Sequence, residues 1–157
     1  MARRGSVLNL TAKELAVGML SRRDHSELEL RQKLAQRQCS PEDIDAAIEH
    51  CLAHTWLDDK RFAEMLLRHG ASKGHGWQRI CFDAKRKGIS VALLEAAQEN
   101  QQHDWFELAK DLAYRRFGNL DGTLPKVDVK QRARWTRYLQ SRGFSFDQIN
   151  YALSNEG

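Results

Sequence analysis

The sequence contains little that would break a helix or span a membrane. It has only two prolines among 157 residues, and β-branched residues are sparse. No apolar run approaches the roughly 20 residues that a membrane-spanning helix requires. The opening Met-Ala-Arg-Arg-Gly-Ser leads into no signal-peptide core. We therefore expect a soluble, cytoplasmic protein that is helical almost throughout.

The cysteines and histidines lack the spacing of a metal site. Cys39, Cys51 and Cys81 lie 12 and 30 residues apart and form no Cys-x-x-Cys pair, which argues against zinc and against a disulfide framework. The six histidines show no His-Glu-x-x-His spacing, and no phosphate loop or nucleophile elbow is present. We expect buried thiols, no metal, no cofactor and no enzymatic activity.

Signals for helix ends recur along the chain. Four residue pairs fit the capping box, in which two free backbone amides at a helix start are satisfied reciprocally: Thr11 with Glu14, Ser26 with Glu29, Asp128 with Gln131, and Ser145 with Gln148. Pro41 suits the first helical position after Ser40. Gly88 and Gly143 each follow a basic run and can end a helix in the left-handed conformation.

An apolar pattern with helical spacing occurs three times, which indicates an internal repeat. Its copies are Leu15-Ala16 with Met19-Leu20, Phe62-Ala63 with Leu66-Leu67, and Leu108-Ala109 with Leu112-Ala113. A further helix, a short turn and a third helix follow each copy. The pattern predicts an all-α fold, a tandem array of three three-helix repeats at residues 8–56, 57–102 and 103–156. Because a unit of about 50 residues buries little apolar surface alone, we expect the repeats to stack into an elongated, curved array.

Positive charge is concentrated in the second helix of each repeat. The third helices, within residues 39–56, 90–103 and 144–157, contain no Lys or Arg, whereas the net charge of the second helices rises from +1 to +3 and then +4. Residues 24–59 carry a net charge of −6. Such an asymmetric field can steer a polyanion or an acidic protein surface towards one side of the molecule.

Eight cations of the second and third repeats form the predicted contact surface, which we call the basic ridge. They are Arg79, Lys85, Arg86, Lys87, Lys130, Arg134, Arg137 and Arg142. Lys130, Arg134 and Arg137 share one helix face by their spacing. Ordinary solvated helix faces are the alternative interpretation of these charges.

The turns before the third helices are similar to helix-turn-helix connections. A major-groove reader would place the first residues after each turn against base edges. Those residues are acidic or apolar: Pro41-Glu42-Asp43, Val91-Ala92-Leu93 and Phe146-Asp147-Gln148. Sequence-specific DNA recognition is therefore disfavoured, whereas contact between the second helices and a phosphate backbone remains open.

Three segments resemble the RecX family of recombination regulators. They are Ser26-x-Leu28-x-Leu30-x-x-Lys33-Leu34, Leu57-Asp58-Asp59-x-Arg61-Phe62-Ala63, and Gly76-x-x-x-Ile80. The resemblance covers nearly the whole chain and implies a helical protein that lies in the groove of the RecA filament on single-stranded DNA. It implies restraint of filament assembly, ATP hydrolysis, strand exchange and coprotease activity, with no catalytic residues.

Some residues admit two interpretations. Adjacent Asp58 and Asp59 could form a metal or acid-base pair, but we favour a helix cap that complements the helix dipole and pairs with Lys60 or Arg61. Ala84 stands where the family commonly has a larger aliphatic residue, so a neighbour such as Trp77 or Phe82 must complete the packing.

Four tryptophans could stack on bases but more often belong to a core: Trp56, Trp77, Trp105 and Trp135. We also expect the segment from Phe117 to Val127, which holds two glycines and a proline, to be the most mobile internal part of the chain.

Three functions remain open at this point. The first is regulation of the RecA filament by a monomeric protein, with possible contact to the single-stranded DNA backbone. The second is non-specific DNA binding without RecA, which would show a steep salt dependence. The third is a generic helical-repeat adaptor for another protein.

Overall fold

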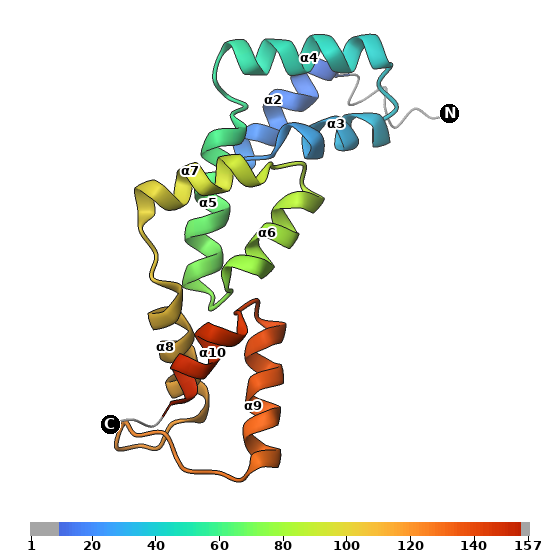
Figure 1. The fold of residues 1–157 in the computed structure, drawn as a ribbon. Coiled ribbons are helices and arrows are strands. Elements are labelled where there is room, and N and C mark those ends of the chain that lie inside the picture. Colours follow the sequence, from blue (N-terminus) through green and yellow to red (C-terminus); the bar gives the residue numbers. More distant parts are fainter. Residues whose placement is uncertain (1–9, 155–157) are drawn as a thin grey trace.

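The structure is a computed structural model that describes residues 10–154, and over that range it contains nine α-helices and no strand (Figure 1). The helices are α2 (Ala12–Arg22), α3 (Glu27–Gln36), α4 (Pro41–Ala53), α5 (Asp59–Ser72), α6 (Trp77–Arg86), α7 (Val91–Gln101), α8 (Trp105–Phe117), α9 (Val129–Ser141) and α10 (Phe146–Leu153). The predicted all-α class is confirmed. Residues 8, 9, 155 and 156 of the predicted repeats lie outside the described residues.

The helices form three successive units, α2–α4, α5–α7 and α8–α10, arranged in an extended, bent array (Figure 1). Within each unit the first and third helices pack most extensively against each other, and the second helix closes the unit. Each unit has its own cluster of buried hydrophobic residues. The predicted array of three three-helix repeats is therefore confirmed.

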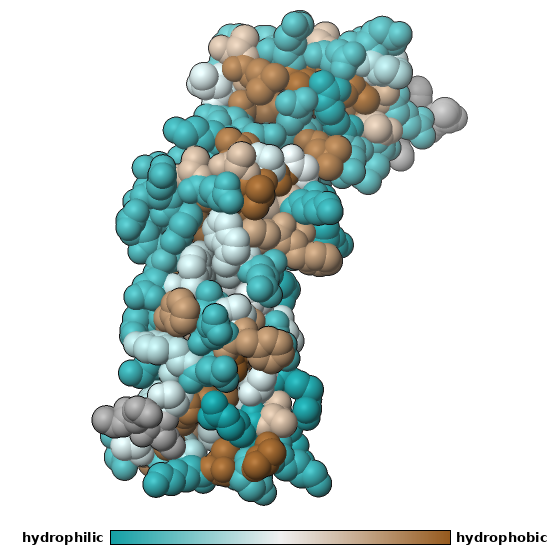
Figure 2. Space-filling model, in the orientation of Figure 1, coloured by the Kyte–Doolittle hydropathy of each residue, from teal (hydrophilic) through white to brown (hydrophobic). Residues whose placement is uncertain are grey.

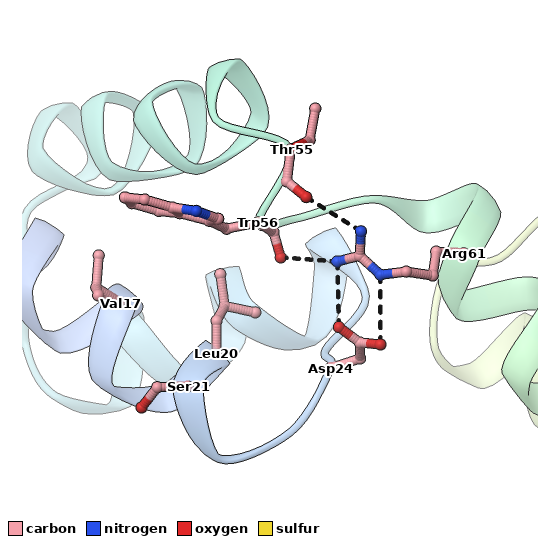
Figure 3. Close-up of a pocket in the computed structure, with 7 residues that line it drawn as sticks. All are labelled: Val17, Leu20, Ser21, Asp24, Thr55, Trp56 and Arg61. Atoms are coloured by element: carbon pink, nitrogen blue, oxygen red, sulfur yellow. Dashed lines mark hydrogen bonds and ion pairs between the residues drawn. The ribbon is translucent and has the colours of Figure 1, made fainter.

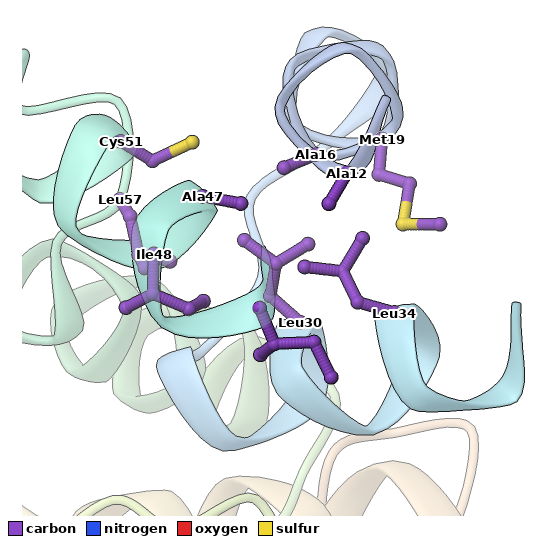
Figure 4. Packing of buried hydrophobic residues seen from close by; sticks show 10 residues of the cluster. Ala12, Ala16, Met19, Leu30, Leu34, Ala47, Ile48, Cys51 and Leu57 are labelled. Carbon is purple, nitrogen blue, oxygen red and sulfur yellow. The ribbon is translucent and has the colours of Figure 1, made fainter. Parts of the chain in front are cut away.

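A small residue lies at the same position in the first helix of each repeat. Ala16, Ala63 and Ala109 are completely buried. In the first repeat, Leu30 and Leu34 of α3 fill the space between α2 and α4 (Figure 4). The alanines leave room for the first and third helices to approach closely, which explains the repeated large-and-small pattern in the sequence.

Side-chain caps start most helices as the sequence predicts. The capping boxes at Thr11, Ser26 and Ser145 are present, and Ser40 caps α4 with Pro41 at its first position. At α9 only half of the predicted box forms. Asp128 accepts a hydrogen bond from the Gln131 amide, but the Gln131 side-chain oxygen accepts from Arg134 at 2.8 Å instead.

The turn after each second helix contains one residue in the left-handed conformation: Gln38 (φ 66°), Gly88 (φ 76°) and Gly143 (φ 104°). A Cβ atom at Gly88 would lie 2.8 Å from Cβ of Leu28 in the first repeat, and a Cβ at Gly143 would collide with the backbone of Arg79 in the second. Glycine at the later two turns therefore provides both the conformation and the space for the neighbouring repeat.

The segment between α8 and α9 makes contacts at its start and at Leu124. Phe117 stacks on Trp135 with 4.5 Å between ring centroids, and the Asn119 amide donates to the Thr123 carbonyl at 2.7 Å. Leu124 is buried in the core of the third repeat. The mobility expected for residues 117–127 stays a prediction, and these contacts define the places where the segment is anchored.

The aromatic residues divide between core and surface. Trp135 is buried, and Trp77 and Trp105 are half-buried, with ring centroids 5.8 Å apart. Trp56 is 43% exposed, so the core interpretation is wrong for that residue. Phe82 is 60% exposed and does not complete the packing around Ala84, whereas Trp77 packs against that core.

The three cysteines are free. Cys51 is buried, and Cys39 and Cys81 are half-buried. Burial raises the pKa of each thiol, which lowers the fraction of reactive thiolate. No helix within residues 10–154 has the length and apolar character needed to cross a membrane.

Candidate partner-binding surface

The second helices α3, α6 and α9 succeed one another along one side of the array (Figure 1). The turn after α6 contacts the start of α3, and the turn after α9 contacts the start of α6. We call the contact between the first and second repeats the first joint and that between the second and third repeats the second joint. The two joints decide which cations of the basic ridge stay available to a partner.

An ion-pair network centred on Glu29 supports the first joint. Its carboxylate accepts from Arg23 Nη2 at 2.9 Å and from Lys87 Nζ at 3.3 Å. Burial by itself would raise the pKa of Glu29, but the hydrogen bonds from Arg23 and Lys87 outweigh it and lower the pKa to about 2. Lys87 of the predicted ridge is thus part of a contact inside the protein.

The segment Leu57-Asp58-Asp59-Lys60-Arg61 builds the rest of the first joint. Asp58 caps α5 by accepting from the amides of Lys60 and Arg61, at 3.0 and 3.2 Å. Asp59 accepts from the Glu27 amide of the first repeat at 2.8 Å. Burial raises the pKa of Asp59, as do the nearby Glu27 and Asp58 carboxylates, while the bond from the Glu27 amide opposes the rise.

The two aspartates serve different contacts, and the favoured cap assignment is confirmed for Asp58. Asp58 also pairs with Arg61 at 3.8 Å, whereas Lys60 pairs with Glu64 at 3.9 Å. Across residues 10–154, no group of three or more His, Cys, Asp and Glu side chains is arranged to hold a metal ion.

Arg61 clamps the connection between the first two repeats (Figure 3). Its guanidinium donates to both carboxylate oxygens of Asp24, at 3.4 and 3.2 Å, and to the carbonyls of Thr55 and Trp56, at 3.1 and 3.0 Å. Beside this clamp lies an open pocket of about 440 Å³. Its apolar lining residues are Val17, Leu20 and Trp56. The Trp56 indole stacks on the His54 ring with 4.5 Å between centroids.

Backbone hydrogen bonds dominate the second joint. The Gly76 amide donates to the Arg142 carbonyl at 2.7 Å, and the Gln78 amide donates to the Gly143 carbonyl at 3.2 Å. The Arg142 guanidinium donates to the Lys73 carbonyl at 3.0 Å. Burial lowers the pKa of His75 here, and the positive charges of Arg79, Arg142 and Lys73 add to that effect.

The basic ridge separates into two groups. Arg79 pairs with Asp83 at 3.2 Å, Lys87 pairs with Glu29, and Arg142 belongs to the second joint. The other five cations are exposed and form no ion pair within residues 10–154: Lys85, Arg86, Lys130, Arg134 and Arg137. Arg79 and Lys87 each keep 39% of their side-chain surface exposed, but a carboxylate of the protein already pairs with each of them.

Two aromatic residues that the sequence did not predict as part of this surface, Tyr138 and Phe82, lie beside cations. The Arg116 guanidinium carbon lies 4.8 Å from the centre of the Tyr138 ring, and Arg142 lies 6.0 Å from the same ring. Phe82 is an exposed aromatic residue with the Arg86 guanidinium 5.8 Å from its ring centre. The helical periodicity could have indicated that Phe82 is exposed, because it does not lie on the face of α6 that buries Ile80 and Ala84. Arg142 lies four residues after Tyr138 at the end of the same helix, whereas Arg116 lies on α8, so no local pattern indicates its contact with Tyr138.

The visible face of the molecule is mostly hydrophilic, with apolar patches between the polar side chains (Figure 2). Three separate cores, two polar joints and exposed second helices define the class: a tandem helical-repeat protein. Comparison with known families matches models described as the first, second and third three-helix domains of RecX to residues 12–51, 58–97 and 102–153. The chain belongs to the RecX family.

Relatives named regulatory protein RecX resemble the chain over most of its length. The protein of Vibrio campbellii (strain ATCC BAA-1116) is 44% identical, and that of Vibrio parahaemolyticus serotype O3:K6 is 45% identical. Each alignment covers 94% of this chain and 92% of the relative. The protein of Serratia proteamaculans (strain 568) is 37% identical, over 85% of this chain and 90% of the relative.

Two crystal structures share the fold. RecX from Lactobacillus salivarius superposes with a TM-score of 0.73 at 21% identity, covering 90% of this chain and 92% of that one. A second structure, described as regulatory protein RecX, has a TM-score of 0.77 at 20% identity, covering 92% and 72% of the two chains. Both confirm the arrangement of the three repeats.

Proposed function

We propose that this protein is a cytoplasmic regulator that binds the RecA nucleoprotein filament and restrains its assembly, ATP hydrolysis, strand exchange and coprotease activity. Membership of the RecX family and the regulatory names of the relatives support this role. The observation that carries the proposal is a set of exposed cations on α6 and α9 that form no ion pair among residues 10–154. These two helices lie along one side of an extended array (Figure 1).

The proposed mechanism depends on unequal binding to two filament states. A ligand shifts an assembly equilibrium only by the difference between its affinities for the two states. An array that contacts more than one RecA subunit gains effective concentration from its linked repeats. Lys85 and Arg86 on α6, with Lys130, Arg134 and Arg137 on α9, are the proposed contacts to acidic patches of RecA or to DNA phosphates.

The remaining ridge residues have a different role in this proposal. Arg79, Lys87 and Arg142 are already engaged by Asp83, Glu29 and the Lys73 carbonyl. Lys87 and Arg142 bridge neighbouring repeats and so help to set the relative positions of α3, α6 and α9, whereas the pair of Arg79 and Asp83 lies within α6. Substitution of Lys87 or Arg142 is therefore expected to alter the shape of the array.

The test is the DNA-dependent ATPase of RecA at substoichiometric concentrations of this protein. Wild-type protein should inhibit it, and the double variant Arg134→Glu/Arg137→Glu should inhibit at least about tenfold less effectively, because it reverses two exposed contacts. Lys13→Glu/Arg68→Glu makes the same change in net charge at exposed positions of α2 and α5 and should behave as wild type. Unchanged helical circular dichroism excludes misfolding.

Each alternative function has its own outcome. Equal DNA binding with and without RecA, falling steeply with salt, would indicate a plain DNA-binding protein. No effect on the RecA ATPase would favour an adaptor for another protein and would overturn the proposal. Inhibition that survives the double reversal would place the contact surface elsewhere on the array.

A further inference from the structure

A second concentration of positive charge lies in the first repeat, on residues of α2 and α3 and the segments that follow them. An open pocket of about 490 Å³ lies between the end of α2 and the last turns of α3. Its lining consists of Met19, Arg22, Arg23, His25, Lys33, Gln36 and Arg37. Four cations thus surround one cavity: Arg22, Arg23, Lys33 and Arg37.

Most of this charge has no counterion within residues 10–154. Arg23 pairs with Glu29 at 2.9 Å, but Arg22, Lys33 and Arg37 form no ion pair with any residue in the range 10–154. Cations often complement the negative end of a helix dipole, and the ends of α2 and α3 supply about one negative charge together. Three unpaired cations exceed that amount, so the cavity keeps a positive surplus.

Comparison between the repeats shows why Arg37 is available. Arg37, Lys87 and Arg142 occupy the same position, directly after the second helix of their repeat. In the later repeats this cation binds an acceptor of the preceding repeat, Glu29 or the Lys73 carbonyl. The Arg37 side chain has no hydrogen bond or ion pair to any described residue and borders the pocket instead.

His25 adds a group that can change its charge in the pocket. It is only 4% exposed, and its Nδ1 lies 3.1 Å from the Arg23 carbonyl. Because a carbonyl only accepts, Nδ1 carries the proton and Nε2 is the atom that titrates. Burial lowers the pKa of His25, as do the positive charges of Arg23 and Lys33, while the Arg23 carbonyl and Glu29 act in the opposite direction.

We propose that this pocket binds a phosphate ester, with Arg22, Lys33 and Arg37 as its cationic partners and His25 as a donor once it is protonated. Arginine presents a planar fork that matches two phosphate oxygens, and lysine adds a compact charge. The phosphate could belong to a free nucleotide or to the backbone of single-stranded nucleic acid. The site lies outside the basic ridge, so it does not depend on the proposed contact with RecA.

The histidine provides a direct measurement. In the full-length protein, the Cε1–H resonance of His25, assigned with His25→Gln, is followed by NMR as inorganic phosphate, adenosine monophosphate or a short oligothymidylate is added. Binding should give a saturable shift and raise the pKa of His25, because a bound anion stabilises the imidazolium. Saturation by the monophosphate or by the oligonucleotide identifies which source of phosphate the pocket takes.

Matched variants separate a site from a diffuse electrostatic effect. Lys33→Glu/Arg37→Glu should lower the affinity at least about tenfold, whereas Lys13→Glu/Arg68→Glu carries the same total charge and should retain it. Circular dichroism checks that both variants are folded. The proposal is overturned if none of the three probes produces a saturable shift at His25, or if the control pair weakens binding as much as the pocket pair.

Discussion

The Arg61 guanidinium contacts three residues in two parts of the chain: Asp24 after α2, and the Thr55 and Trp56 carbonyls that precede α5. Asp59 of the same short motif accepts a hydrogen bond from the Glu27 amide, so both residues connect the first repeat to the second. The function of this motif is therefore architectural, since its polar atoms are directed at other residues of the same chain.

The cap at Asp58 leads to a first prediction. Asp58→Ala should lower the free energy of unfolding by about 1 kcal/mol, because the amides of Lys60 and Arg61 lose their acceptor. Urea unfolding followed by circular dichroism measures this change. Asp104→Ala, which removes the equivalent cap of α8, should have a similar effect. Loss of RecA inhibition in a fully folded Asp58→Ala variant would instead indicate that Asp58 contacts the partner.

Glu29 gives a prediction for pH dependence. Its folded-state pKa of about 2 is lower than its usual value of 4.5, so its stabilising effect is complete above pH 4.5 and is lost as pH falls towards 2. Glu29→Gln should lower the stability at pH 7 by about 1–3 kcal/mol and flatten this acid dependence. Urea unfolding between these pH limits tests it.

The control for Glu29 is Glu42→Gln, which changes the same group at an exposed position that forms no ion pair with any other described residue. It should leave the acid dependence unchanged. If Glu29→Gln retains the slope of the wild type, the network of Arg23 and Lys87 does not stabilise the ionised carboxylate.

Residue roles were predictable from sequence where the interaction is local. The caps at Ser26 and Ser145 follow from neighbours three residues away, and the start of α4 at Ser40 follows from the adjacent Pro41; the structure has all three. The partners of Asp59 and Lys87 lie 32 and 58 residues away, and no local pattern indicates them. Charge alone could not distinguish Lys87, which is ion-paired, from Lys85, which is exposed.

At the scale of the helix, the glycine after α9 shows how a turn can serve a neighbouring repeat. The sequence predicts a left-handed helix end at Gly143, and the structure has it. The close approach of Arg79 adds a second requirement that only the stacked repeats reveal. At the equivalent turn of the first repeat, Gln38 adopts φ 66°.

A matched pair of substitutions separates the two requirements. Gly122→Ala places a side chain at φ +85° in open space and should cost about 1–2 kcal/mol through backbone strain alone. Gly143→Ala adds a collision with Arg79 and should cost more. Thermal unfolding measures both, and small-angle scattering should report a changed shape only for Gly143→Ala. Equal losses of stability would indicate that the second joint can rearrange to accommodate the added methyl group without a further loss of unfolding free energy.

At the scale of the whole molecule, the array depends on two joints of different chemistry. Ion pairs and the Arg61 clamp join the first two repeats, whereas backbone hydrogen bonds dominate between the second and third. The repeat pattern in the sequence was sufficient to predict the array. It could not predict which cations the joints occupy, because that depends on how separate repeats meet.

Two neighbouring lysines test the separation of joint and contact surface. Lys87→Glu should break the pair with Glu29, place two like charges together and broaden the distribution of shapes seen by small-angle scattering. Lys85→Glu should preserve the scattering profile and weaken the inhibition of RecA. If Lys87→Glu leaves the shape unchanged, then Leu28, Gly88 and the Arg61 clamp suffice to hold the first joint.

The separate cores also bear on how the chain folds during synthesis. Each hydrophobic cluster draws its residues from one continuous stretch, apart from a few half-buried neighbours such as Trp105. A nascent chain can thus complete the first core while later helices are still inside the ribosome. The acceptors of Arg61, which are Asp24 and the carbonyls of Thr55 and Trp56, all precede it in the chain. Each repeat can therefore pack, as it is synthesised, against a preceding repeat that has already folded.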